Sequence, residues 1–496
     1  MDNGTKINVP NVSQSINVKY LKLLYHHLIS NLLTLTSIPL IIVASMEASK
    51  MNVDDFNRLG SFLQNNLIAV AFGCTFLIFS LIVYFLIRPR PIYLIDFSCY
   101  RAPDEHKAPK SMFMEHCRQF GIFEESSLDF QEKILERSGM GDETYLPEAV
   151  GYIPPRPTIA LAREEAEMVM FGALDNLFAN TNLNPKNIDI LIVNCALFNP
   201  APSLSAMIVN KYKLRTDIVT FNLGGMGCSA GVIAVGLAKD LLQVYRNCNA
   251  VVVSTEIITL NWYKGNEKSM LISNCIFRVG GAAMLLSNKS SDKRRAKYKL
   301  LHVVRTHFGS DDKAFNALRQ QQDGEGNVGV LLTRDVSPIC GKALKVNITK
   351  LGPLVLPISE QLLYLATLMV NKLFKAKMKP YVPDFKSAFD HFCIHAGGRA
   401  IIDELEQNLK LSPEDVEASR MTLHRFGNTS SSSIWYELGY IESKKKMRKG
   451  NRVWQIGLGG GFKCNSAVWV ALRDIKPALN CAWKDCIDKY PVNLDD

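Results

Sequence analysis

Long uncharged stretches dominate the first ninety residues and do not recur later in the chain. Residues 28–46 and 67–87 contain no charged side chain, and a bilayer crossing needs about 20 such residues. We therefore predict two transmembrane helices at 28–46 and 67–87, joined by a charged loop in a hairpin that occupies residues 28–87. Lys19 and Lys22 precede the pair and Arg88 follows it, so both ends are expected in the cytosol, with residues 1–27 as a cytosolic tail.

The remaining pattern alternates between helical and strand-like periods. A linker rich in Pro and Arg, with the first strand, occupies residues 88–112. Beyond it, buried β-branched runs predict strands and longer amphipathic runs predict helices, which is typical of an α/β fold. The expected strands are Ile188–Val193, Ile218–Phe221, Val251–Thr255 and Ala282–Leu286, and the expected helices are Arg163–Phe178 and Ala201–Tyr212.

The later part repeats this order. Strand-like Phe389–His395 is followed by helical Arg399–Leu409, and Asn428 opens another helix. The interval from Cys195 to Cys228 equals that from His395 to Asn428. This matched order predicts a duplicated domain. Its halves are expected at 113–357 and 358–496, and the second begins with a helix at Ile358–Lys375 and ends with a strand at Val453–Leu458, a turn at Gly459–Gly461 and a helix at Cys464–Leu472.

One cysteine lies between a buried strand and a helix. Gly224, Gly225 and Gly227 follow the apolar run that ends at Phe221, and Cys228 comes next, before small residues and a helical pattern. Such a turn is typical of a nucleophile elbow, here with sulfur as the nucleophile. Because a helix N-terminus favours negative charge, we expect this environment to lower the pKa of the Cys228 thiol. A buried structural cysteine is the alternative interpretation.

Charge and cysteine usage narrow the class of protein. The net charge is +10, but the basic clusters are short and have no interleaved aromatics, so nucleic acid is not an expected partner. A basic surface also suits anionic phospholipids or phosphate-bearing substrates. The 12 cysteines show neither disulfide nor zinc spacing, which indicates free thiols in a reducing compartment. This argues against a signal peptide at the first apolar span, because a signal peptide would send the chain to an oxidising lumen.

Three further motifs carry histidine or asparagine. HFCIHAGGRA holds His391 and His395, HRFGNTSSSSIWYE holds His424 and Asn428, and RTHFG holds His307. A thiol with His and Asn indicates acyl chemistry through a thioester. A papain-type protease would use the same groups but has an aromatic residue after its cysteine, where this chain has small residues. A buried histidine or a helix cap is the structural alternative for each residue taken alone.

With these motifs, the chain resembles the plant 3-ketoacyl-CoA synthases over nearly its whole length. The matching segments are NLGGMGCSAG, FCIHAGGRA, HRFGNTSSSSIWYEL and GFKCNS. The resemblance implies a duplicated thiolase-like αβαβα fold, related to the chalcone-synthase-type polyketide synthases. It also implies a condensation of malonyl-CoA with a long-chain acyl-CoA, which gives 3-oxoacyl-CoA, CO2 and CoA.

The resemblance also implies residue roles. Cys228 would carry the acyl group as a thioester, and His395 with Asn428 would donate hydrogen bonds to the malonyl thioester oxygen. His307, His391 and His424 match positions that the family marks as functional, and we expect them to orient other groups. Backbone N–H groups at Cys228 and at Gly459–Gly461 would hold the acyl oxyanion.

The same resemblance implies the cofactors, the cellular location and the partners of the protein. No metal or organic cofactor is expected beyond the two CoA substrates. The family location is the endoplasmic reticulum membrane, beside a ketoacyl-CoA reductase, a dehydratase and an enoyl-CoA reductase, and the wider family is homodimeric. Two rival hypotheses remain: a type III polyketide-synthase-like enzyme that uses several extensions, and a non-catalytic scaffold of the elongase.

Overall fold

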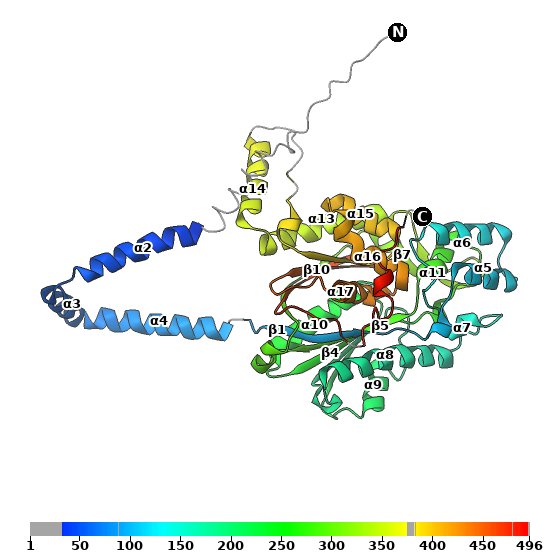
Figure 1. Ribbon diagram of the computed structural model, residues 1–496, viewed down its shortest axis with the longest axis horizontal. Helices are drawn as coiled ribbons and strands as arrows, with labels where there is room; N and C mark the ends of the chain where they lie inside the picture. Colours follow the sequence, from blue (N-terminus) through cyan, green and yellow to red (C-terminus); the bar gives the residue numbers. More distant parts are fainter. Residues whose placement is uncertain (1–31, 88, 374–380, 382, 479, 495–496) are drawn as a thin grey trace, which may run out of the picture. The chain divides into compact units, whose positions relative to one another are not determined.

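The computed structural model describes residues 32–87, 89–373, 381, 383–478 and 480–494 (Figure 1). The chain divides into two compact units. One contains residues 1–89 and 355–387, and the other contains residues 90–354 and 388–496. The second unit, called the α/β body below, holds every sequence-predicted site residue.

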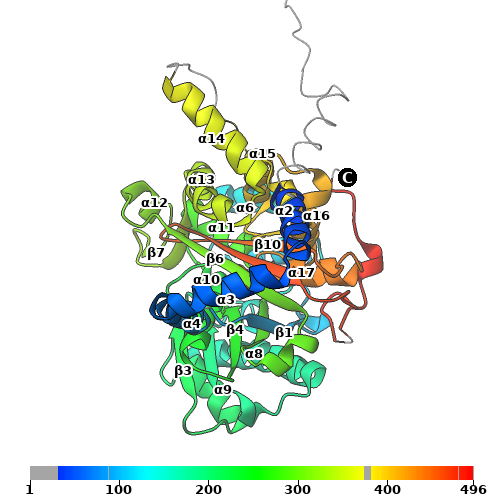
Figure 2. The ribbon, with the colours of Figure 1, turned by 90° about the vertical axis from the view of Figure 1, so that its left-hand side faces the viewer.

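A nine-stranded sheet forms the core of the α/β body, in the order β3-β2-β4-β5-β1-β6-β11-β10-β9. Most of its strands are fully buried runs of β-branched and aliphatic residues, as expected for strands covered on both faces. Figure 2 shows β4 and β1 below β6 and β10. The strand bounds are β1 Ile92–Cys99, β2 Ile190–Asn194, β3 Val219–Leu223, β4 Asn249–Glu256, β5 Gly280–Ser287, β6 Tyr298–His307, β9 His391–Ile394, β10 Arg452–Gly459 and β11 Lys463–Ala471.

The sheet consists of two similar halves joined at β1 and β6. In the first half β2 runs parallel to β3 and β4, and β5 is antiparallel to β4 and β1. In the second half β9 runs parallel to β10, and β11 is antiparallel to β10 and β6. The antiparallel pairing of β1 with β6 closes the seam. Within the described residues, the second half has no counterpart of β3.

Two helices lie between the halves and form the central layer. Helix α10 (Ala230–Val244) contacts β2 and β4 of the first half and β6, β10 and β11 of the second. Helix α17 (Ser433–Ser443) likewise contacts β1 and β5 as well as β9 and β10. Figure 1 shows both helices between β10 above and β4 below. Helices α8 (Ile159–Thr181) and α9 (Leu204–Tyr212) cover the outer face of the first half, and α15 (Arg399–Leu409) and α16 (Pro413–Phe426) lie on the second, which gives αβαβα layers.

Within the described residues, the predicted strands and helices of both halves are present, with one error near the C-terminus. Residues 374–375 of the helix predicted at Ile358–Lys375 lie outside the described residues. We expected a helix at Cys464–Leu472, but these residues form strand β11, antiparallel to β10. The sequence KCNSAVWVA is rich in β-branched and aromatic residues, and the short turn at Gly460–Phe462 returns the chain directly beside β10.

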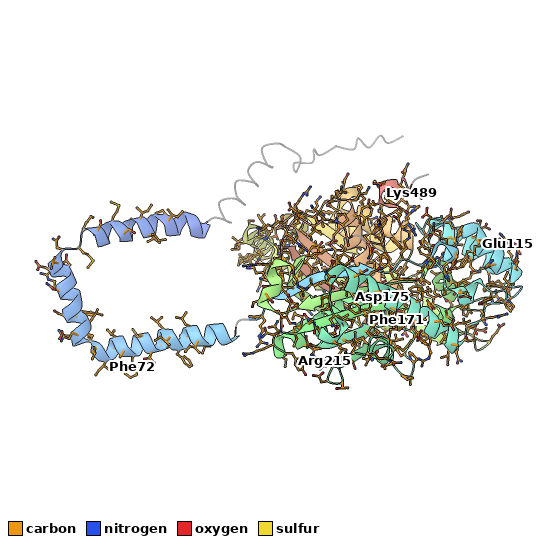
Figure 3. All side chains as sticks on the ribbon, turned by 60° about the horizontal axis from the view of Figure 1, so that its bottom comes forward. Phe72, Glu115, Phe171, Asp175, Arg215 and Lys489 are labelled. Carbon is orange, nitrogen blue, oxygen red and sulfur yellow. The ribbon has the colours of Figure 1, made fainter. Side chains whose placement is uncertain are left out.

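The described residues before Pro89 form three helices: α2 (Leu32–Ser49), α3 (Val53–Asn65) and α4 (Leu67–Ile87). The segment expected as a charged loop is helical because Asn52 and Asp55 form a capping box at the start of α3. Residues 28–31 of the first predicted span lie outside the described residues. Figure 3 shows side chains on both sides of α4, where Phe72 is 74% exposed.

Taken singly, no helix of the described residues has both the length and the apolar composition of a membrane crossing. The helices Val53–Asn65 and Leu67–Val83, with a bend of 85° between them, have this length and composition only as a pair.

The remaining elements of the α/β body are α5 (Lys110–Gln119), α6 (Glu125–Arg137), α7 (Glu148–Gly151), α11 (Lys268–Ile276), α12 (Asp312–Asn316), α13 (Val336–Val355), and a hairpin of β7 (Leu318–Gln322) with β8 (Val328–Leu332). Helix α14 (Ile358–Leu373) belongs to the unit that contains residues 1–89.

Candidate active site

Cys228 lies in a tight turn between β3 and α10. Gly225 and Gly227 have φ values of 65° and 66°, a region that favours glycine. A Cβ on Gly227 would lie 2.6 Å from the backbone nitrogen of Gly460, so a side chain there would collide with the facing turn. A Cβ on Gly459 would lie 3.0 Å from the Cys228 nitrogen. The two glycine turns therefore pack together around the backbone N–H of Cys228.

The electrostatics of Cys228 differ from the expectation of a low pKa. The thiol is buried, and this burial raises the pKa of Cys228 to about 12. A hydrogen bond from Ser430 acts in the opposite direction, and the negative charge of Glu256 raises the pKa further. The helix begins only at Ala230, with Ser229 as its N-cap, so Cys228 stands before the first helical turn. The resting thiol is therefore protonated at neutral pH, and its reaction needs a base.

Ser430 connects the thiol to a buried carboxylate. Its hydroxyl oxygen lies 3.2 Å from Oε2 of Glu256 and also forms the hydrogen bond with Cys228. Glu256 ends β4 and accepts hydrogen bonds from the backbone N–H groups of Ala196 and Leu197 at 3.2 and 2.9 Å. In the protonated resting state the Cys228 S–H therefore donates to the Ser430 hydroxyl oxygen, while the Ser430 hydroxyl donates to Glu256.

Asn428 is held by the same loop. Its Oδ1 accepts a hydrogen bond from the Ser430 backbone N–H at 2.8 Å, and its Nδ2 donates to the Gly397 carbonyl at 3.2 Å. The Asn428 backbone pairs with Ile276 and Arg278, which fixes the residue at the start of the loop before α17. Asn428 therefore contacts Ser430 on one side and Gly397 on the other.

His395 follows the last residue of β9 and is 4% exposed. Its Nδ1 lies 2.8 Å from the Ser433 hydroxyl at the start of α17. A Cβ on Gly397 would lie 3.1 Å from Nε2, so the ring packs against the residue that accepts from Asn428. Burial lowers the pKa of His395 to about 4, which keeps the imidazole neutral at pH 7. Since a hydroxyl donates or accepts, Ser433 satisfies Nδ1 in either tautomer and leaves Nε2 to act as donor or acceptor.

The structure thus joins Cys228, Asn428 and His395 through two intermediate residues, Ser430 and Gly397. All three side chains are buried, and they come from three separate segments of the chain.

His307 lies next to this group. It ends β6, opposite Lys463 in β11, and its Nδ1 accepts a hydrogen bond from the Gly309 N–H at 2.9 Å. A Cβ on Gly309 would lie 2.9 Å from the Gly461 carbonyl, so the His307 turn packs on the glycine turn that faces Cys228. Burial and the charge of Lys463 lower the pKa of His307.

The other two histidines have different surroundings. His391 begins β9, whereas His395 follows its end, so the two are separated by about 13 Å of extended chain. The hydrogen bonds of His391 are with the Asn451 side chain and the Lys446 backbone. His424 lies in the last turn of α16, with Nδ1 3.2 Å from the Tyr490 hydroxyl and its ring against Gly141. Neither contact set includes Cys228, Asn428 or His395.

A separate cavity of about 530 Å³ lies elsewhere on the α/β body. Its lining includes Met112, Phe113, Tyr152 and Trp262 and none of the six sequence-predicted site residues. The chemistry of the site therefore rests on the side-chain contacts above and not on that cavity.

Sequence reasoning missed Ser430 and Glu256. Ser430 lies two residues after Asn428, for which a helix cap was the structural alternative, and its φ of 56° is rare for a residue with a side chain. Glu256 is a charged residue at the carboxyl end of a buried strand, where α/β proteins commonly place functional groups. A charged residue at this position was the signal by which the sequence could have identified Glu256.

Comparison with known proteins identifies the fold class of this chain. The family described as FAE1/type III polyketide synthase-like protein matches residues 84–373, and that of the chalcone and stilbene synthase C-terminal domain matches 334–468. A solved type III polyketide synthase, 1,3,6,8-tetrahydroxynaphthalene synthase from Streptomyces coelicolor, superposes with a TM-score of 0.63 at 18% identity. It covers 77% of this chain and 99% of its own length. The fold is therefore that of the thiolase-like condensing enzymes.

Relatives that match over nearly their full length identify the family within this fold class. The chain is 68% identical to 3-ketoacyl-CoA synthase 4 of Arabidopsis thaliana, over 98% of this chain and 94% of the relative. It is 62% identical to 3-ketoacyl-CoA synthase 9 of the same plant, over 100% and 96%. The chain belongs to the 3-ketoacyl-CoA synthase family of condensing acyltransferases.

Proposed function

We propose that the protein catalyses the decarboxylative condensation of malonyl-CoA with a long-chain acyl-CoA, the first step of very-long-chain fatty acid elongation. The observation that carries the proposal is the connected set of Cys228, Asn428 and His395, bridged by Ser430 and Gly397. A nucleophile, a neutral imidazole and an amide in one buried site suit acyl transfer followed by carbanion chemistry.

The first step transfers the acyl group to Cys228. Because burial raises the pKa of this thiol, its proton must leave as sulfur attacks the acyl-CoA carbonyl. His395 is neutral and has Nδ1 engaged by Ser433, so its Nε2 accepts that proton. The departing CoA thiolate then takes the proton and leaves as CoA. Backbone N–H groups at Cys228 and Gly459–Gly461 hold the carbonyl oxygen during the transfer.

The second step removes CO2 from malonyl-CoA. The C–C bond to the carboxylate breaks, and its electron pair moves toward the thioester oxygen as an enolate. In this step the neutral imidazole of His395 is in the Nε2–H tautomer, in which Ser433 donates to Nδ1, whereas the first step used the Nδ1–H tautomer. His395 Nε2–H and Asn428 Nδ2–H donate hydrogen bonds to the enolate oxygen, where charge develops. One such donor is typically worth roughly 2.7–4 kcal/mol in the transition state.

The third step forms the product. The enolate carbon attacks the acyl thioester, and the bond to the Cys228 sulfur breaks, which releases 3-oxoacyl-CoA. The thiolate takes up one proton from solvent to restore the thiol. Decarboxylation supplies the driving force, so the proposed reaction uses no metal or organic cofactor.

His307 is proposed to keep the glycine turn beside Cys228 in place through Gly309. His391 and His424 have contacts remote from these steps, and we assign them positioning roles within their own elements.

The proposed setting is the endoplasmic reticulum membrane, with residues 28–87 as an anchor and the α/β body in the cytosol. A long acyl chain partitions into lipid by about 0.8 kcal/mol per buried CH2, so anchoring brings the enzyme to its substrate. A homodimer and the three other elongase enzymes are the proposed partners.

Radioactive acyl-CoA tests the reaction in microsomes that contain the full chain. The wild type is expected to become labelled on Cys228 and, with malonyl-CoA, to give a product longer by two carbons. Cys228→Ala at an equal protein level is expected to lose both label and product. Condensation by that variant would refute the mechanism. Products from several successive extensions would favour the polyketide-synthase alternative, and an unlabelled wild type would favour the scaffold.

A further inference from the structure

Helix α14 carries an outward-facing apolar stripe. Ile358, Leu362, Leu365, Met369 and Leu373 recur at intervals of three and four, the spacing of one helical face. Their exposed fractions are 59%, 42%, 46%, 52% and 75%. Lys372, seven residues after Leu365, is exposed at the edge of this stripe, which carries no other charged residue of the described helix.

The opposite face of α14 carries polar residues, and it is turned inward at the first turn, where Ser359 and Glu360 are buried. Glu360 is fully buried and accepts hydrogen bonds from the Tyr381 hydroxyl at 2.7 Å and from the Asp384 N–H at 3.0 Å. Thr367, on the same side, donates to the Tyr364 carbonyl at 2.7 Å. This polarity is the reverse of that of a surface helix in a water-soluble protein, where the apolar face is the covered one. The buried carboxylate therefore fixes which face of α14 points outward.

We propose that α14 lies in the plane of a membrane surface, with its apolar stripe among the lipid chains. An exposed apolar face next to cations is the composition of interfacial helices. Lys372 is exposed on α14, and the sequence continues with lysines at 375, 377 and 379, which lie outside the described residues. This charge is complementary to anionic phospholipid headgroups.

Two observations favour lipid over other occupants. Residues 355–387 group with residues 1–89, which contain the exposed apolar side chains of α2 and α4, and not with the α/β body. The cationic end also favours an anionic surface over a second copy of a chain whose net charge is +10. The choice of lipid rests on the proposed membrane setting, but α14 adds a contact beyond the N-terminal anchor.

A tryptophan placed on the stripe tests this inference in the full chain. The five native tryptophans are buried in the α/β body, so they supply a constant background. Met369→Trp adds a reporter to the outward face, and Thr367→Trp is the matched control on the inward face. Both variants are reconstituted in phosphatidylcholine vesicles that contain about one phosphatidylserine in five, with or without chain-brominated phosphatidylcholine.

Bromine is expected to quench the added emission of Met369→Trp at least about threefold more than that of Thr367→Trp. Adding Leu365→Glu to Met369→Trp is expected to reduce the quenching, and omitting phosphatidylserine is expected to weaken it because Lys372 loses its counter-charge. Since both 365 and 369 are exposed, melting temperatures should stay within a few degrees of wild type.

Three results would overturn the proposal. Unquenched, water-like emission would mean that the stripe faces solvent. A blue shift that grows with protein concentration, without quenching, would identify a second copy as the occupant. A blue shift that is independent of concentration and unquenched would mean that another segment of the same chain covers the stripe. If neither the wild type nor any variant sediments with vesicles, the proposed membrane setting is wrong. If all of them sediment but Met369→Trp is not quenched, only the inference on α14 is wrong.

Discussion

The two halves of the α/β body use equivalent positions for different chemistry. Cys195 directly follows β2, and His395 directly follows the corresponding strand β9. Cys228 precedes α10, and Asn428 precedes α17. The first half thus contributes the nucleophile at its helix position, and the second contributes an imidazole at its strand position and an amide at its helix position.

This difference shows how a duplicated scaffold creates an asymmetric site. Because α10 and α17 form one central layer, their starting loops meet, and a Cβ on Gly231 would lie 2.4 Å from the Ser431 carbonyl. Symmetry brings the loops together, and divergence of side chains gives one loop the sulfur and the other its hydrogen-bond donors. Glu256 and Ser430 contact each other across this junction.

Among the residues that assist Cys228, the largest effect is expected from His395, at the strand position of the second half. His395→Ala removes the base for the Cys228 thiol and one donor to the enolate, so kcat should fall by about a thousandfold or more. Both acyl labelling and malonyl-CoA decarboxylation should slow in single-turnover assays. His391→Ala, at the other end of β9, is the control and should change kcat by less than about threefold. Rapid acylation of His395→Ala would exclude the base role.

Asn428→Ala tests whether the amide of the second half acts in decarboxylation and not in acylation of Cys228. It removes a donor that acts only on the enolate, so decarboxylation should fall by about 10²–10³-fold while Cys228 still accepts the acyl group. Radiolabelled acyl-enzyme should accumulate in this variant. Absence of acyl-enzyme would show that Asn428 also supports the first step, contrary to the assignment.

The pH dependence of Cys228 tests whether the helix position of the first half lowers or raises a thiol pKa. Burial raises this pKa, so iodoacetamide modification should rise about tenfold per pH unit from pH 7 to about pH 9.5 without a plateau. The modified Cys228 peptide is quantified by mass spectrometry. A plateau near pH 7 would mean a stabilised thiolate and would restore the expectation from the sequence.

The contact of Ser430 with Glu256 predicts two smaller changes in the Cys228 pKa, which have opposite signs. Ser430→Ala removes a hydrogen bond that lowers the Cys228 pKa, so alkylation at pH 8 should slow by about three- to tenfold. Glu256→Gln removes a negative charge that raises this pKa, so the same rate should increase by a similar factor. Ser432→Ala, whose hydroxyl donates to the Thr429 carbonyl, is the matched control. Equal changes in all three variants would indicate a general packing effect.

Cys195→Ala should have the smallest effect. Although Cys195 occupies the position equivalent to His395, its thiol is engaged by Glu256, whose Oε1 lies 3.3 Å away. We expect kcat to change by less than about threefold. A loss comparable to that of His395→Ala would mean that the halves share the chemistry more evenly than the contacts indicate.

The alternation of apolar runs was enough to predict the α/β fold, and the equal intervals between Cys195 and Cys228 and between His395 and Asn428 correspond to equivalent positions in the two halves. The strand β11 was misjudged because apolar runs of this length suit either element, and only the pairing with β10 decides between them. The raised pKa of Cys228 also depends on burial by distant segments. Ser430 and Glu256 required the structure because their contact joins residues far apart in the sequence.

The position of β1 has a consequence for biosynthesis. This strand follows α4 by only a few residues, yet it lies at the seam and pairs with β5 and β6, which are translated roughly 200 residues later. At about 5–20 residues per second, an apolar strand emerging from the ribosome waits roughly 10–40 s for its partners. Nascent chains of this enzyme should therefore depend on chaperones during that interval, and a truncation that starts beyond residue 92 would leave the two halves without the strand that joins them.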